Sequence, residues 1–303
     1  AYFAGCTGKF LFPDVPKAAV EVFENMGLEV YFPEQKCCGM PSLLEGDRKL
    51  TLEFIRFNVE HLAEAVEEGY DVVCSCPTCG YLFKNVLGEG AYFSREYQET
   101  CRGDDKNIRI PTRKHSGGLG ERSFKSLPKI IYKDLLRDEG YFSTISPLKR
   151  IRVSENTYDL GEYLVALLKN EKYTSGFNPT NARLVYYPPC HLREQGIGFP
   201  YMDLLGKIPG VSLDQVQNHF YCCGLGGIMG FKKNFHESSL KLGKDLMEKI
   251  REMNPERLVT DCLSCRMQFE QLLPYDVVHP IEILRDSLSG NQTQGVRRSE
   301  GRL

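Results

Sequence analysis

Twelve of the 303 residues are cysteines, and ten of these repeat one pattern twice along the chain. Each copy has a single cysteine, then two adjacent cysteines followed by glycine, then a C-x-x-C pair. Matched cysteines of the two copies lie 184 to 186 residues apart, which indicates an internal duplication. The ten residues are Cys6, Cys37, Cys38, Cys76 and Cys79 in the first copy and Cys190, Cys222, Cys223, Cys262 and Cys265 in the second.

Five thiols per copy suggest a metal centre. Tetrahedral zinc and a cubane [4Fe–4S] cluster each need only four thiolates. The fifth cysteine favours an iron–sulfur cluster with a doubly ligated iron or a bridging thiolate, and structural zinc with a spare cysteine is the alternative. Disulfides are the least favoured option, because no export signal is found and a reducing compartment is therefore expected. Cys74 and Cys101 fall outside the repeated pattern, and their roles stay open.

The composition describes a globular protein without nucleic-acid features. Apolar residues make up 42% of the chain, charged residues 26%, and the formal net charge is −2. A nucleic-acid-binding protein would be expected to carry a basic stripe. No apolar run approaches the ~18–20 residues of a membrane span, and the first residues do not form a signal peptide. We therefore expect a cytoplasmic protein with no transmembrane span of its own, or one held at the inner face of the membrane through a partner.

The segments between the cysteines predict alternating strands and helices. Strands are expected at 1–6, 28–33 and 70–76 in the first copy, with a long amphipathic helix between Asp47 as N-cap and Gly69 as C-cap. The second copy repeats this order. Strands that alternate with helices of this length indicate a parallel sheet, whose carboxyl ends share one edge. We expect each cysteine group to lie at that edge, with each C-x-x-C opening a helix whose N–H groups stabilise thiolates.

The adjacent cysteines pose a geometric problem that the following glycine solves. Neighbouring side chains of a regular strand point to opposite faces, so Cys37 and Cys38 share a site only if the backbone leaves strand geometry. Gly39 and Gly224 make such a bend accessible and allow the backbone to approach a bulky cofactor.

These motifs resemble those of the cysteine-rich CCG-domain iron–sulfur oxidoreductases. That family includes heterodisulfide reductase catalytic subunits and the iron–sulfur subunits of anaerobic respiratory dehydrogenases. The second copy, with "YYPPCHLREQG", "YCCGLGGIMGFKK", "LVTDCLSCRMQFE" and "VHPIEIL", is similar to C subunits of anaerobic glycerol-3-phosphate dehydrogenases. The resemblance covers about residues 2–288. It implies an α/β fold of two pseudo-symmetric tandem CCG domains, each a small parallel sheet with flanking helices.

The resemblance also implies the cofactors and the ligands. The ten matched cysteines are the expected ligands of two [4Fe–4S] clusters of the non-cubane kind, with zinc in one copy as the alternative. Relatives of the respiratory type usually carry a ferredoxin-like cysteine run before the first CCG domain, and this chain has none. We therefore expect either a fragment or a subunit whose ferredoxin is separate.

The repeat predicts the domain boundaries. The first CCG domain is expected at 1–172 with an insertion at about 88–150, the second at 181–288, and a mobile tail at 289–303. The insertion reads as loop-rich with one helix within 127–140. A surface excursion is the favoured interpretation, and an interface to a partner subunit is the alternative.

Two histidines are candidate catalytic residues near the cysteines. His191 follows Cys190, and its proposed roles are proton donation or hydrogen bonding to a cluster sulfur, or simple capping of local backbone. His279 lies at a predicted strand end on the same edge, where a structural role or support of the metal ligands is expected.

Three functions are compatible with these features. The favoured one is an iron–sulfur electron-transfer subunit of an anaerobic oxidoreductase complex. It would take electrons from a flavoprotein dehydrogenase or a ferredoxin-like subunit and pass them to an acceptor such as a quinone. The alternative is a heterodisulfide-reductase-type catalytic subunit that cleaves a disulfide substrate at a non-cubane cluster. The third is a zinc-stabilised interaction module without redox activity.

Overall fold

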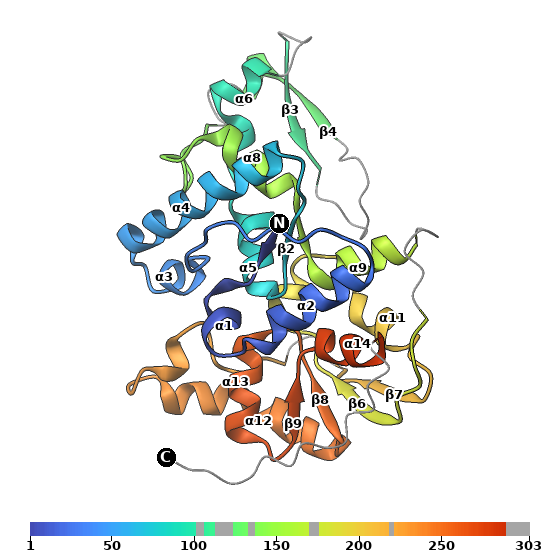
Figure 1. Ribbon diagram of the computed structural model, residues 1–303. Helices are drawn as coiled ribbons and strands as arrows, with labels where there is room; N and C mark the ends of the chain where they lie inside the picture. The colour runs from blue at the N-terminus through green and yellow to red at the C-terminus, as the bar shows by residue number, and fades with distance from the viewer. Residues whose placement is uncertain (101–105, 113–123, 133–136, 170–175, 218–220, 289–303) are drawn as a thin grey trace.

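The computed structural model describes residues 1–100, 106–112, 124–132, 137–169, 176–217 and 221–288. Two parallel sheets organise the chain, one in each copy of the cysteine pattern (Figure 1). A separate antiparallel pair of strands lies in the predicted insertion. The predicted tail 289–303 and Cys101 lie outside the described residues.

The first sheet has three short parallel strands in the order β1–β2–β5. The side chains of β1 and β2 are buried, as expected for parallel strands that helices cover on both faces. The long helix begins after Asp47 as predicted, because the Asp47 side chain accepts the Leu50 N–H. The elements of this half are β1 (Tyr2–Phe3), α1 (Gly5–Phe10), α2 (Asp14–Asn25), α3 (Met40–Leu44), α4 (Arg48–Glu67), β2 (Val72–Cys74), α5 (Pro77–Tyr81), η1 (Leu82–Val86), β5 (Thr157–Asp159) and α9 (Leu160–Leu168).

The second sheet has four parallel strands in the order β7–β6–β8–β9. Its middle strands β6 and β8 end in buried apolar residues, Tyr186 and Val259. The elements of this half are β6 (Ala182–Tyr186), α10 (Cys190–Arg193), α11 (Pro200–Leu205), β7 (Val211–Gln215), η4 (Met229–Phe231), α12 (His236–Met253), β8 (Arg257–Val259), α13 (Leu263–Leu272), β9 (Asp276–Val278) and α14 (Pro280–Leu288).

The strand predicted at 28–33 does not form. One main-chain hydrogen bond, from Tyr2 N–H to Tyr31 O at 2.8 Å, joins this segment to β1. Leu28 N–H instead donates to Phe23 O and closes the end of α2. Tyr31 and Phe32 are exposed, so the segment lacks the buried face that would hold it in register. In the second half β7 does pair with β6, over five residues.

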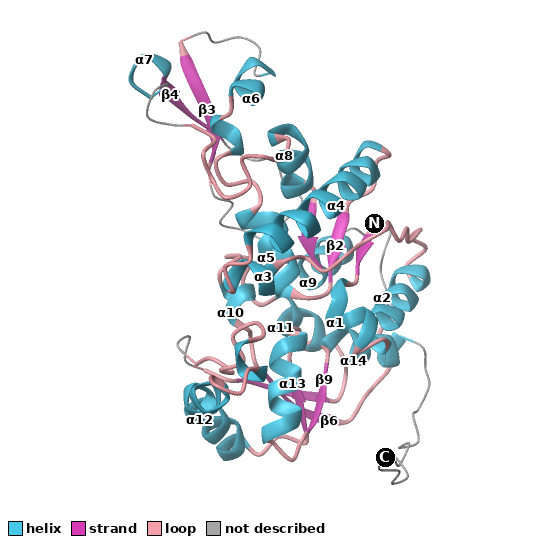
Figure 2. Cartoon of the chain, turned by 90° about the vertical axis from the view of Figure 1, so that its left-hand side faces the viewer, coloured by secondary structure: helices cyan, strands magenta, loops and turns pink. Residues whose placement is uncertain are grey.

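The described part of the predicted insertion contains an antiparallel pair of strands, β3 and β4, which the sequence did not predict. The predicted loops at 101–105 and 115–120 lie outside the described residues, and the helix predicted within 127–140 is described only as α7. Figures 1 and 2 show the hairpin projecting away from both sheets. Its elements are η2 (Ala91–Phe93), α6 (Arg95–Thr100), β3 (Asn107–Pro111), β4 (Phe124–Pro128), α7 (Lys129–Tyr132) and α8 (Pro147–Glu155).

The two halves share one apolar core. Helix α2 of the first half packs against α14 of the second, and α9 packs in the matching way against α11. Buried residues of both sheets, among them Tyr2, Val73, Tyr186 and Val259, belong to one hydrophobic cluster. The predicted fold class, an α/β arrangement of two similar halves with small parallel sheets, is confirmed. The boundaries 1–172 and 181–288 stay a prediction. Within the described ranges no helix has both the length and the apolar character needed to cross a membrane.

Candidate functional site

Eight of the ten cysteines of the repeat follow the carboxyl ends of strands, and Cys37 and Cys38 follow the segment 28–33, which forms no strand. Cys6 lies in α1 directly after β1, and Cys190 begins α10 after β6. Cys76 and Cys262 are the N-cap residues of α5 and α13. The C-x-x-C pairs therefore open helices as predicted, with their sulfurs next to free backbone N–H groups. Helices α5 and α10 lie side by side between the two sheets (Figure 2).

The C-C-G turns show why glycine follows the paired cysteines. Gly39 has φ 91° and Gly224 has φ 87°, a left-handed conformation that other residues rarely adopt. The turn directs main-chain N–H groups toward the sulfurs, and Gly224 N–H donates to Cys222 Sγ at 3.4 Å. The next N–H, from Leu225, donates to Cys223. Two successive amides thus stabilise two successive thiolates.

The first C-C-G turn has the same arrangement. Gly39 N–H donates to Cys37, and Met40 N–H donates to Cys38. Asn58, a fully buried residue of α4, braces this turn by accepting Lys36 N–H at 2.9 Å and donating to Cys37 O at 2.8 Å.

Nine of the ten sulfurs, all except that of Cys190, follow one another through both halves in what we call the sulfur line. Cys6 Sγ lies 3.3 Å from Cys37 Sγ, and Cys265 Sγ lies 3.2 Å from Cys223 Sγ. The two halves meet at Cys76 and Cys262, which lie close enough for each thiol to shift the pKa of the other. Five further pairs complete the line, and in each pair the two neighbouring thiols shift one another's pKa: Cys37–Cys38, Cys38–Cys79, Cys76–Cys79, Cys262–Cys265 and Cys222–Cys223.

The middle of this line is buried and its ends are partly exposed. Both C-x-x-C pairs are at most 6% exposed, whereas Cys6, Cys37, Cys190 and Cys222 are half-buried. Cys190 lies outside the sulfur line, and burial together with the charge of Cys223 raises its pKa. The arrangement therefore has a dry centre and two ends near solvent.

Three thiols are set apart by their lowered pKa values. Hydrogen bonds from Cys37 and Cys79 lower the pKa of Cys38 to about 5, against the opposing effect of burial. Hydrogen bonds from Cys222 and Cys265 lower the pKa of Cys223 in the same way. The pKa of Cys76 is lowered by hydrogen bonds from Cys262 and Cys79 and by amides at the start of α5. These three thiols favour the thiolate, the form that binds metal, whereas the pKa values of the other seven cysteines of the repeat are raised.

The donor set fits an iron–sulfur group. The candidate ligands are all soft sulfur donors, and several of them are buried and lie beside backbone amides, features that suit such clusters. Among the described residues, no three Cys, His, Asp or Glu side chains are arranged around a single point that could hold one metal ion. Ligands of a multi-iron cluster bind different irons and need no such common point.

The two predicted histidines both reach across to the first half. His191 Nδ1 lies 2.9 Å from Thr78 Oγ1, and the His191 ring stacks on Tyr81. Burial lowers the pKa of His191. His279 is fully buried, and its Nε2 lies 3.0 Å from Ser75 O. Burial lowers the pKa of His279 to about 4, so this ring is neutral at pH 7.

Several residues near the cysteines were not predicted from the sequence. Asn58 and Thr78 support the cysteine segments, and Gln195 donates to Pro77 O at 3.3 Å. Asp159 and Asp261 are buried carboxyls behind the cysteine edge, and burial raises both pKa values, that of Asp159 to about 7. Of these residues, only Thr78 could have been singled out from the sequence, because it lies between the two cysteines of the first C-x-x-C. The others are ordinary polar residues whose burial no local pattern reveals.

Cys74, which lies outside the repeated cysteine pattern, is part of the apolar core of the first half. It lies in β2, is fully buried and belongs to the apolar cluster of the first half. Burial raises its pKa, so the neutral thiol is favoured in this apolar position.

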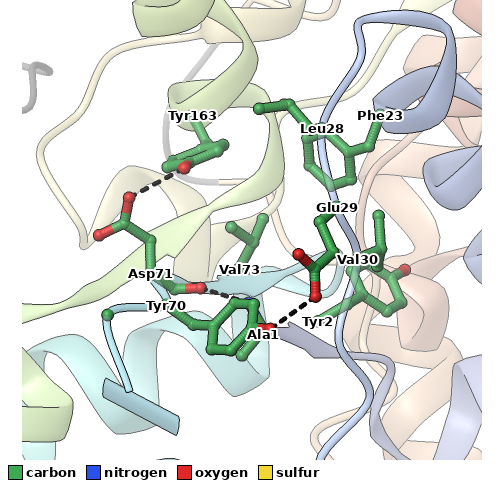
Figure 3. A pocket seen from close by; sticks show the side chains of 11 residues that line it. Ala1, Tyr2, Phe23, Leu28, Glu29, Val30, Tyr70, Asp71, Val73 and Tyr163 are labelled. Carbon is green, nitrogen blue, oxygen red and sulfur yellow. Dashed lines mark hydrogen bonds between the residues drawn. The ribbon is translucent and has the colours of Figure 1, made fainter. Parts of the chain in front are cut away.

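A cavity of about 240 Å³ lies elsewhere, beside the amino end of the chain (Figure 3). Ala1 donates to Asp71 O at 2.7 Å, and Tyr163 OH donates to Asp71 Oδ2 at 2.8 Å. None of the ten cysteines is among the described residues that line it. The cavity is therefore separate from the sulfur line.

Comparison with known proteins identifies related chains. The cysteine-rich CCG domain matches residues 1–84 and again 184–270. The chain is 26% identical to the C subunit of anaerobic glycerol-3-phosphate dehydrogenase from Escherichia coli K12, over 95% of this chain and 59% of that protein. It is 25% identical to the B subunit of fumarate reductase (CoM/CoB) from Methanothermobacter marburgensis, over 93% of this chain and 44% of that protein.

A third relative has a similar length. Lactate utilization protein A of Geobacillus sp. WCH70 is 25% identical over 93% of this chain and 97% of that protein. The first two relatives are longer, and the chain spans about three-fifths of the dehydrogenase subunit and less than half of the reductase subunit. The expected relationship to oxidoreductase subunits is confirmed. Because the CCG match covers more than half of the chain, this protein belongs to the family of cysteine-rich CCG-domain proteins.

Proposed function

We propose that this chain is an iron–sulfur electron-transfer subunit of an anaerobic oxidoreductase complex. The observation that carries the proposal is the sulfur line, in which the cysteines of both halves meet at Cys76 and Cys262. A path between two redox centres requires ligands of both to lie close together, and this contact supplies that closeness inside a buried region.

The residues of the chain have defined tasks in this function. The ten repeated cysteines would hold two [4Fe–4S] clusters of the non-cubane kind, and such groups supply one-electron redox chemistry when bound. The amides of the two C-C-G turns stabilise negative charge on the thiolates. The buried C-x-x-C pairs exclude water from the centre of the line. The partly exposed ends at Cys6 and Cys222 give partners access to it.

The partners follow from the same proposal. We expect electrons to arrive from a flavoprotein dehydrogenase or a ferredoxin-like subunit and to leave toward an acceptor such as a quinone. The names of two relatives describe subunits of a dehydrogenase and of a reductase, which supports assembly into a larger complex. We expect a cytoplasmic location or attachment to the inner face of the membrane through such a partner.

A second candidate is a catalytic subunit that cleaves a disulfide. Two observations favour it: the half-buried cysteines at the ends of the line, and the relative whose name includes CoM/CoB. In this function an exposed end would admit a disulfide or thiol substrate to the cluster.

Metal analysis with EPR tests both candidates. Anaerobically purified protein is assayed for iron, sulfide and zinc, and EPR of the oxidised form is recorded before and after addition of a thiol. We expect about eight irons per chain, four for each cluster. A signal that the thiol leaves unchanged supports electron transfer, and a perturbed signal supports disulfide cleavage. Four irons with one zinc would make one half structural, and zinc alone would overturn both candidates.

A further inference from the structure

Polar side chains of the second half surround the first C-x-x-C segment at residues 75–80. His279 makes the first contact. Ile281 N–H donates to His279 Nδ1 at 3.1 Å, so Nδ1 is the acceptor and the proton of the neutral ring lies on Nε2. Nε2–H therefore donates to Ser75 O at 3.0 Å, directly before Cys76. One ring thus caps α14 and holds the loop that presents a ligand of the other half.

Gln195 makes the second contact. Its Nε2 donates to Pro77 O at 3.3 Å and lies over Gly80, where an added Cβ would come within 3.4 Å of Nε2. The side chain is 4% exposed, and its Oε1 has no hydrogen-bond partner among the described residues. A buried amide oxygen without a partner costs about 1–3 kcal/mol, which leucine would avoid. The presence of an amide at this position is therefore best explained by the hydrogen bond that its N–H₂ group donates to Pro77 O.

His191 makes the third contact. Its Nδ1 lies 2.9 Å from Thr78 Oγ1, and its ring stacks on Tyr81 at the end of α5. Thr78 Oγ1 is itself 3.9 Å from Cys262 Sγ. The two C-x-x-C segments are therefore linked through Thr78 as well as through their sulfurs.

The second C-x-x-C segment has a different support. The first half contacts it through apolar groups, since Leu263 lies against Gly8 and the Arg266 guanidinium lies 4.4 Å from the Phe12 ring centre. Apart from Thr78, the described part of the first half gives it no matching set of polar side chains. The first C-x-x-C segment therefore depends on polar side chains of the second half, whereas the second C-x-x-C segment has no comparable dependence on the described part of the first half.

We propose that His191, Gln195 and His279 are positioning residues that hold the first C-x-x-C in its ligand geometry, so that the first site depends on the folded second half. The inference rests on the proposed function where it treats Cys76 and Cys79 as cluster ligands. The contacts themselves exist without a cluster, and this allows a test on metal-free protein.

The test compares alkylation rates of four buried cysteines by mass spectrometry. Gln195→Leu removes the donor to Pro77 O at constant volume. Gln268→Leu is the matched control, because Gln268 is also buried and donates within the second half to Ser239 Oγ. His279→Asn is the second variant, since asparagine still caps α14 but does not reach Ser75 O.

The expected result is a local change. Loss of one buried hydrogen bond should speed alkylation of Cys76 and Cys79 about tenfold in Gln195→Leu and His279→Asn, through easier local opening. In these two variants the alkylation rates of Cys262 and Cys265 should stay at the wild-type level. In the control Gln268→Leu the alkylation rate of Cys76 should also stay at the wild-type level. Unchanged rates, or equal acceleration in both halves, would overturn the proposal. If Gln195→Leu does not fold, the alkylation rates of Cys76 and Cys79 in His279→Asn test the proposal.

Iron analysis separates this inference from the proposed function. In anaerobically purified Gln195→Leu we expect an altered EPR signal of one cluster and an unaltered signal of the other. A wild-type protein without iron whose variants still show the alkylation difference would overturn the function and keep the positioning role. Variants that keep the full iron content and alkylate at the wild-type rate would support the proposed function and overturn the positioning role.

Discussion

The two halves carry the same cysteine pattern on different supports. In the first half, Asn58 on α4 braces the C-C-G turn by bonding the main chain on both sides of it. In the second, Ser239 on α12 donates to Gly224 O at 2.8 Å. The C-x-x-C of the first half is held by polar groups and that of the second by apolar packing and a cation–ring contact. The two halves therefore share the cysteine positions and differ in the side chains around them, because the motif needs only the turn and the helix start.

Removal of one thiol from either half has the largest expected effect. Cys38→Ala and Cys223→Ala each delete a thiol whose pKa is lowered by hydrogen bonds from two other cysteines. We expect each variant to lose about half of the iron, because a four-iron cluster needs its full ligand set. Iron analysis of anaerobically purified protein measures this. Retention of full iron content by either variant would refute the assignment of that half.

The two C-C-G glycines should differ in their tolerance of alanine. Both have positive φ, so alanine costs about 1–2 kcal/mol at each position. An added Cβ at Gly224 would collide with Ser239 O, whereas at Gly39 its nearest contact is Ile55 at an ordinary 3.6 Å. We expect Gly39→Ala to lose about 1–2 kcal/mol of unfolding free energy and Gly224→Ala about 3 kcal/mol or more. Urea unfolding measures both, and equal losses would contradict the difference in space around the two turns.

The N-cap residues of α9 and α14 should respond to pH in opposite directions. Burial raises the pKa of Asp159 from 3.8 to about 7, so its contribution to stability is full below pH 4 and is lost as the pH rises to 7. Burial lowers the pKa of His279 from 6.5 to about 4, so its contribution is full above pH 6.5 and is lost as the pH falls to 4.

Asparagine at each cap tests this difference, since it caps helices without titrating. Relative to wild type, Asp159→Asn should gain on the order of 4 kcal/mol of unfolding free energy between pH 4 and pH 8. His279→Asn should show its largest deficit at pH 8 and a smaller one at pH 4.5. Unfolding free energies across this range are the measurement, and parallel pH profiles for the two variants would contradict the opposite shifts.

The contact between Phe12 and Arg266 should have the smallest effect. Phe12→Leu keeps an apolar side chain and removes the ring beneath the guanidinium, so we expect a loss of about 0.5–1 kcal/mol. A double-mutant cycle with Arg266→Gln isolates the pair in thermal or urea unfolding. Additive losses would show that the ring contributes packing alone.

Much of the site could be predicted from residue types and spacing. Cys76 and Cys262 were expected to open helices at strand ends, and both are N-cap residues. Asp47 was expected to cap the long helix, and it does. These features depend on local backbone preferences, which a short stretch of sequence contains.

The elements that the sequence did not predict correctly depend on contacts with residues far away along the chain. The segment 28–33 has the composition of a strand, yet it makes one hydrogen bond to β1 because its aromatic residues face solvent. The hairpin of β3 and β4 also escaped prediction, since its strands pair across residues that read as loop. Pairing and burial decided both cases, and neither is a property of the segment alone.

The sequence by itself determined the repeated pattern of ten thiols in two equal groups with matched spacing. Only the tertiary structure decided that the two groups meet at Cys76 and Cys262, and that His279 and Gln195 hold a segment more than one hundred residues away. The physical reason is that these contacts arise when α2 docks on α14 and α9 on α11 through a shared apolar core. Apolar patterns predict that such faces are buried, but not against which partner.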